Sequence, residues 1–90
     1  MKKIEIIPLA KKKLDRREIG EEWVIETLRD PGQIVEGYGG RNVAQKKFVV
    51  EGKEYLLRVV FEEQGESIVV ITGYLTSQVN RYWEGNNNEN

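Results

Sequence analysis

Residues 53–77 have the sequence KEYLLRVVFEEQGESIVVITGYLTS, which predicts two β-strands joined by a polar turn. In its first part, aromatic and aliphatic side chains recur at positions 55, 57, 59 and 61, the period of two that is typical of a strand. Residues 62–66 carry the charges and the glycine of a loop. Residues 68–72 are apolar on both faces, which predicts an inner strand of a sheet. We expect the rest of the chain to cover or extend this hairpin.

A further strand is expected directly before the hairpin. Residues 43–50 have strand character, and Glu51-Gly52 is suited to a two-residue turn into the central stretch. A two-residue closure places Lys47 on the same sheet face as Arg58, whereas a three-residue loop would place Lys46 there. In either case, one lysine of this pair shares a face with Arg58.

The first third of the chain predicts a short strand followed by two helices. Residues 3–7 alternate as a strand does, and Pro8 then opens a helix that reaches about Arg17. The second helix follows Gly20, with glutamates in its first turn and an arginine in its last, as the helix dipole favours. The sequence Asp-Pro-Gly at residues 30–32 ends it, because a residue before proline avoids the α region.

The remaining segments are short. Residues 33–36 are a candidate extended piece, and residues 37–41 (GYGGR) form a glycine-rich loop whose spacing does not match a phosphate-binding loop. Residues 76–83 predict one or two turns of amphipathic helix. Residues 84–90 have the composition of a disordered polar tail.

These elements predict a single α+β domain over residues 1–83, in the order β-α-α-β-β-β. Helices early in the chain and consecutive strands after them are typical of a small, mostly antiparallel sheet with both helices packed on one face. The other face of the sheet is then the candidate functional surface.

Composition restricts the chemistry that the chain can perform. It has 90 residues, no cysteine, no histidine and a formal net charge of −1. Disulfides, thiolate metal sites and the usual neutral-pH acid–base group are therefore excluded, and we expect neither a metal site nor a cofactor. Apolar runs fall far short of the roughly 20 residues of a membrane helix. No leader sequence is apparent, so we expect a cytoplasmic protein without membrane contact.

Several short motifs carry a family resemblance. They are Ile7-Pro8-Leu9-Ala10, Arg17-Glu18-Ile19, Glu21-Glu22-Trp23-Val24, Leu28-Arg29-Asp30-Pro31, Leu56-Leu57-Arg58-Val59-Val60, Ile68-Val69-Val70-Ile71-Thr72-Gly73-Tyr74 and Arg81-Tyr82. Together they cover about residues 4–83. The chain resembles a family of small bacterial domains of unknown function whose fold is similar to the RelE/ParE/BrnT toxins. Where that family usually has a histidine after the proline of the first helix, this chain has Leu9.

The resemblance implies a RelE-like fold and a candidate activity, cleavage of mRNA on the ribosome. In this reaction a ribose 2′-OH attacks the adjacent phosphate, and RelE-like toxins use Lys, Arg and Tyr side chains for it rather than histidine. By position, the implied catalytic residues are Lys47, Arg58 and Tyr82, and the implied RNA-binding residues are Lys46, Tyr74, Arg81 and Arg41. The implied partners are an antitoxin protein and mRNA with the ribosome, and a weak homodimer is a further candidate.

Two other functions remain open at this point. A non-catalytic module that binds protein or nucleic acid is favoured by Leu9, by the missing general base and by the slightly acidic balance. A ParE-like inhibitor of gyrase would act by protein contact alone. Arg58 also has a purely structural alternative, a salt bridge to Glu54, Glu62 or Glu36 along or across the sheet.

Overall fold

The computed structural model describes residues 2–85, apart from the side chain of Tyr38. Within this range the chain has an α+β fold with a five-stranded mixed sheet and three α-helices. In chain order the elements are β1 (Lys3–Ile6), α1 (Pro8–Arg16), α2 (Glu21–Arg29), β2 (Gln33–Glu36), β3 (Asn42–Val50), β4 (Lys53–Gln64), β5 (Ser67–Thr76) and α3 (Val79–Tyr82), with a 3₁₀ turn at Tyr38–Gly40 between β2 and β3.

The strands lie in the order β1-β5-β4-β3-β2. β1 runs parallel to β5, and the other neighbours are antiparallel. The predicted inner position of the last strand is confirmed, since β5 lies between β1 and β4. The predicted order was short by one strand, because residues 33–36 form β2 at the far edge. The backbone N–H of Gly32 donates to the carbonyl of Gln45 (2.8 Å), which brings the chain back onto β3 after α2.

The β3–β4 turn settles which lysine faces Arg58. It contains two residues, Glu51 and Gly52, with φ angles of 52° and 81°. Lys47 consequently lies opposite Leu56 on the face that carries Arg58, and Lys46 lies on the other face. The β4–β5 turn is shorter than expected, because residues 62–64 continue β4 instead of forming a loop.

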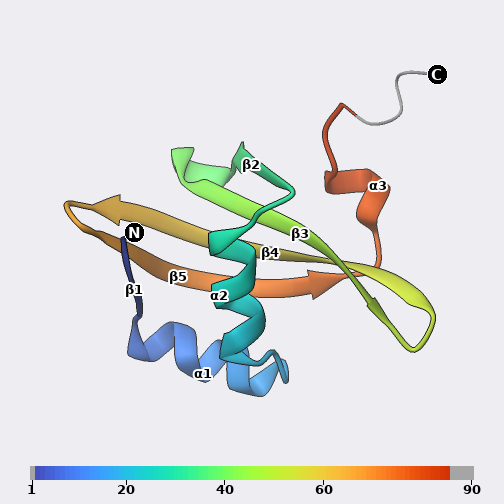
Figure 1. Ribbon diagram of the computed structural model, residues 1–90, viewed down its shortest axis with the longest axis horizontal. Helices are drawn as coiled ribbons and strands as arrows, with labels where there is room; N and C mark the ends of the chain where they lie inside the picture. The colour runs from blue at the N-terminus through green and yellow to red at the C-terminus, as the bar shows by residue number, and fades with distance from the viewer. Residues whose placement is uncertain (1, 86–90) are drawn as a thin grey trace.

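Both long helices pack on one face of the sheet, as predicted (Figure 1). Pro8 opens α1, as expected, and α1 and α2 supply the helical side of the core. Trp23 of α2 stacks on Phe48 of β3, with ring centroids 4.4 Å apart. The buried side chains of this core are Ala10, Leu14, Ile19, Val24, Leu57, Val59 and Val70.

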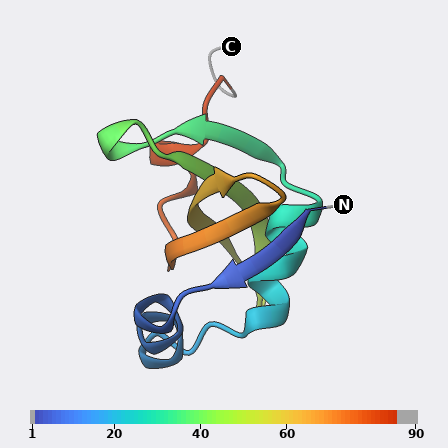
Figure 2. The same ribbon diagram turned by 90° about the vertical axis from the view of Figure 1, so that its left-hand side faces the viewer.

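The C-terminal segment lies on the opposite side of the sheet, so the layers run helices, sheet, C-terminal segment (Figure 2). Val79 of α3 is buried, and the Trp83 ring packs so closely on Gly32 that a Cβ atom there would lie 2.7 Å from it. Glu84 exchanges two hydrogen bonds with the Gln33 side chain (2.6 and 3.1 Å). Glu84 is thus held against β2, and residues 86–90 of the predicted tail lie outside the described residues.

Between residues 2 and 85, every helix is too short or too polar to cross a membrane.

Candidate functional site

Three neighbouring strands place polar side chains side by side on the face away from α1 and α2. Gln45 of β3 lies opposite Arg58 of β4, which lies opposite Tyr74 of β5. Directly opposite residues of paired strands point to the same face, so these three side chains meet in one row across the sheet.

Arg58 is the centre of this row. Its Nε donates to Gln45 Oε1 (2.6 Å), and its Nη1 donates to the Tyr74 hydroxyl. The guanidinium carbon also lies 4.3 Å from the centroid of the Tyr82 ring, which α3 holds over it. The Tyr74 and Tyr82 rings meet edge to face, 6.4 Å apart. A strand, its neighbours and α3 thus hold one guanidinium in a fixed orientation.

The half-buried Arg58 has only neutral partners within the described chain. No carboxylate between residues 2 and 85 comes within 4.0 Å of its guanidinium. The salt bridge to Glu54, Glu62 or Glu36 that would have explained Arg58 structurally is therefore not formed. A cation removed from much of its water favours an anion as its remaining partner.

Gln45 is the residue that sequence reasoning did not assign to the site. Its side chain is fully buried; its Nε2 donates to Gln33 Oε1 (2.9 Å) and to the Tyr82 carbonyl (3.2 Å). Together with its contact to Arg58, it joins β2, β4 and α3. The register of the two-residue turn could have identified it, because that register places the Gln45 amide directly opposite an arginine in the middle of the neighbouring strand.

A hollow of about 280 Å³ lies beside the row. Its walls are Val43 and Val60, and Arg58 and Arg41 both line it. Arg41 Nε pairs with Glu62 (2.8 Å), but their side chains are 46% and 38% exposed, so water and salt weaken this pair. The other lining residues are Gly37, Thr72 and Tyr74.

The family described as "Domain of unknown function (DUF4258)" matches residues 10–74. The chain belongs to the DUF4258 family. No curated protein and no solved structure matches it. The segment matched to DUF4258 contains Arg41, Gln45, Arg58 and Tyr74, and it ends before Tyr82.

The two predicted lysines of this DUF4258 domain lie away from the row. Lys46 is on the helix face, where its ammonium contacts the carbonyl (2.8 Å) and the carboxylate (3.2 Å) of Asp30. Lys47 shares the face of Arg58, but its ammonium lies 4.3 Å from the centroid of the Trp83 ring. The structure therefore brings together Arg58, Tyr74 and Tyr82 and leaves both lysines outside the row.

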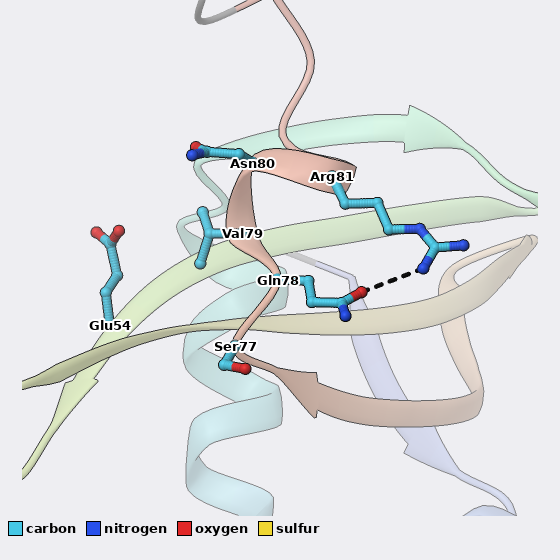
Figure 3. Close-up of a pocket in the computed structure, with 6 residues that line it drawn as sticks. All are labelled: Glu54, Ser77, Gln78, Val79, Asn80 and Arg81. Carbon is cyan, nitrogen blue, oxygen red and sulfur yellow. Dashed lines mark hydrogen bonds between the residues drawn. The ribbon is translucent and has the colours of Figure 1, made fainter.

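Arg81 lies on the exposed side of α3. It donates to Gln78 Oε1 (3.2 Å) beside an open hollow of about 500 Å³. Figure 3 shows that Arg81 points away from Glu54, the acidic residue that also lines this hollow. This second hollow therefore has no converging pair of charged groups.

The row can bind an anion and supply a proton. The Tyr74 hydroxyl accepts a hydrogen bond from Arg58, so its own proton is available to a ligand. Over residues 2–85 no group of three or more carboxylates could hold a metal ion. Arginine and tyrosine are thus the anion-binding and proton-donating groups of the row.

Proposed function

We propose that this DUF4258 domain has a fold of the RelE/ParE/BrnT toxin type and cleaves mRNA without a metal ion. The observation that carries the proposal is Arg58, a half-buried cation without a carboxylate partner in the described chain, beside a hollow. The planar guanidinium fork is well suited to binding two phosphate oxygens at once.

In the proposed reaction, a ribose 2′-oxygen bonds to the adjacent phosphorus and the 5′-oxygen of the next nucleotide leaves. Arg58 stabilises the extra negative charge on the phosphoryl oxygens, as preorganised cations do in such transition states. The Tyr74 hydroxyl donates a proton to the leaving oxygen, and Tyr82 offers a ring on which a base can stack. Lys47 is the candidate acceptor of the 2′-OH proton, and it must leave the Trp83 ring and be neutral to act.

A non-catalytic RNA-binding module is the second candidate. It is favoured by the positions of the two lysines, because Lys46 lies on the other face and Lys47 contacts Trp83. Without one of them, the row has an anion-binding group and a proton donor but no proton acceptor. For the toxin proposal, we expect an antitoxin partner to cover Arg58.

Induced expression in a bacterium tests the proposal. Growth and the integrity of a translated reporter mRNA would be followed for the wild type, Arg58→Met and Tyr74→Phe. Lys12→Ala is the matched control, because it also removes one positive charge but lies on the exposed side of α1. Circular dichroism of the purified variants shows whether each is folded.

We expect growth arrest and new mRNA ends with the wild type and Lys12→Ala, and loss of both in folded Arg58→Met. Arrest with intact mRNA would contradict the nuclease proposal and favour a protein target. Full expression without arrest or cleavage would also contradict it and would favour the non-catalytic module.

A further inference from the structure

We propose that the hollow beside Arg58 is a guanine-binding pocket, which holds one base of an RNA strand while Arg58 holds the phosphate of that nucleotide. This inference rests on the proposed function, since it names the RNA feature that the same face would recognise. It rests on the apolar walls of the hollow and on the two arginines that line it, Arg58 and Arg41, and not on the row alone.

The walls suit a flat ring. Val43 and Val60 line the hollow with apolar surface, and Tyr74 lines it beside Arg58. A Cβ atom on Gly37 would lie 2.6 Å from Val43 Cγ2, so the absence of a side chain there lets the loop after β2 lie close against this wall. Single-stranded RNA commonly places an unstacked base in a pocket of this kind.

The spacing along β4 between Arg58 and Glu62, the partner of Arg41, suits one nucleotide. Arg58, Val60 and Glu62 alternate along β4 on the same face, and Glu62 holds Arg41. Four residues of a strand span roughly 13 Å. This length is comparable to that of a nucleotide from its phosphate to the far edge of its base. A phosphate on Arg58 therefore brings the base edge to Arg41.

The chemistry of Arg41 favours guanine. Its Nε is occupied by Glu62, while its two terminal nitrogens make no hydrogen bond within the described chain. Guanine presents two acceptors, O6 and N7, to such a pair of donors, and this is the commonest specific arginine contact to a base. Adenine has an amino donor in place of O6, so one Arg41 nitrogen would meet a donor.

Binding to the purified full chain tests the inference. Calorimetric titration would compare 5′-GMP, 5′-AMP, 5′-CMP and 5′-UMP, and the trinucleotides UGU and UAU. We expect GMP to bind roughly tenfold more tightly than AMP. Arg41→Gln should abolish this preference while the nucleotides still bind, and Arg58→Gln should weaken all four nucleotides alike. Lys12→Ala, with the same loss of charge, should change neither.

Equal affinity for the four bases, a guanine preference that survives Arg41→Gln, or no binding at all would each overturn the inference. UGU should bind more tightly than GMP, because the flanking phosphates add contacts to an RNA ligand. The reverse order would indicate a free nucleotide as the ligand and would also count against it.

The cleavage experiment in cells tests the proposed function separately from the guanine pocket. Cleavage of mRNA that depends on Arg58 but shows no guanine at the cut sites would leave the nuclease standing and remove the guanine pocket. Guanine binding with the predicted variant pattern but no cleavage in cells would leave the pocket standing and remove the nuclease.

Discussion

A single buried amide fixes the direction of the arginine at the centre of the site. Gln45 uses its oxygen for Arg58 and its nitrogen for Gln33 and the Tyr82 carbonyl. The oxygen of an amide side chain accepts hydrogen bonds, and its nitrogen donates them. The Gln45 oxygen therefore fixes the direction of the Arg58 guanidinium, while its nitrogen holds the α3 backbone. Gln45 is thus a positioning residue, since it acts on a ligand only through Arg58.

Replacing Gln45 with leucine should destabilise the domain. The change removes three hydrogen bonds from a fully buried position and leaves polar partners without them, so we expect the free energy of unfolding to fall by about 2–3 kcal/mol. Urea denaturation followed by tryptophan fluorescence measures this. Gln64→Leu, at the exposed end of β4, is the control and should change the value by less than about 0.5 kcal/mol. Similar losses in both variants would contradict the role of Gln45.

Sequence reasoning reached part of this site. The sequence narrowed the lysine that shares a face with Arg58 to Lys47 for a two-residue turn or Lys46 for a three-residue loop, and the two-residue turn of the structure selects Lys47. Gln45 was given no role, because an amide in a strand has no periodicity of its own. The directions of Lys46 and Lys47 depend on Asp30 and Trp83, which are distant in sequence.

At the scale of the element, the β3–β4 turn determines which side chains face the site. Glu51 and Gly52 both have positive φ angles, as the central residues of a type I′ turn do. Glycine adopts this conformation freely, but glutamate does so at a cost. The turn therefore keeps the register despite an unfavourable residue at its first central position.

Substituting Glu51 with asparagine should stabilise the hairpin. Asparagine tolerates a positive φ better than glutamate does, and Asn-Gly is the preferred type I′ pair, so we expect a gain of about 0.5–1 kcal/mol. Thermal unfolding monitored by circular dichroism would report it as a higher midpoint. Glu54→Asn, in β4 at a residue without positive φ, should give no gain. An unchanged or lower midpoint for Glu51→Asn would contradict the expected strain.

Elements differ in how far the sequence predicts them. The two long helices have their own periodicity and boundary residues and were predicted with close bounds, whereas the two strands of the 53–77 hairpin are longer than predicted. β2 has only four residues. It forms a strand because it pairs with β3 and because Gly32, just before it, is hydrogen-bonded to Gln45 of β3. Such a pairing is a tertiary event, which local sequence patterns do not contain.

At the scale of the whole molecule, the sheet has an edge that one side chain covers. β1 pairs with β5 only as far as Val70, although β5 continues to Thr76. Beyond that point, Arg17 Nη1 donates to the Gly73 carbonyl (2.8 Å) and to Thr72 Oγ1 (3.3 Å). Charged side chains at such edges discourage pairing with another chain.

Removing this side chain should promote self-association. We expect Arg17→Ser to form oligomers at concentrations where the wild type does not, because the β5 edge becomes available to a second strand. Sedimentation velocity over a concentration series measures the effect. Arg16→Ser removes the same charge one residue earlier and should behave as the wild type. Identical sedimentation of both variants would show that Arg17 does not protect the edge.

The parallel pairing of β1 with β5 also has a consequence for synthesis. Lys3 pairs with Ser67, so β1, the first strand of this sheet to be synthesised, must wait for β5, its last strand, before it has a partner. Until then, Ile4 and Ile6 have no strand beside them, and the long separation makes closure of the sheet slow. A nascent chain stopped before residue 67 should therefore remain open to proteases, and the domain should become resistant only when β5 has been released.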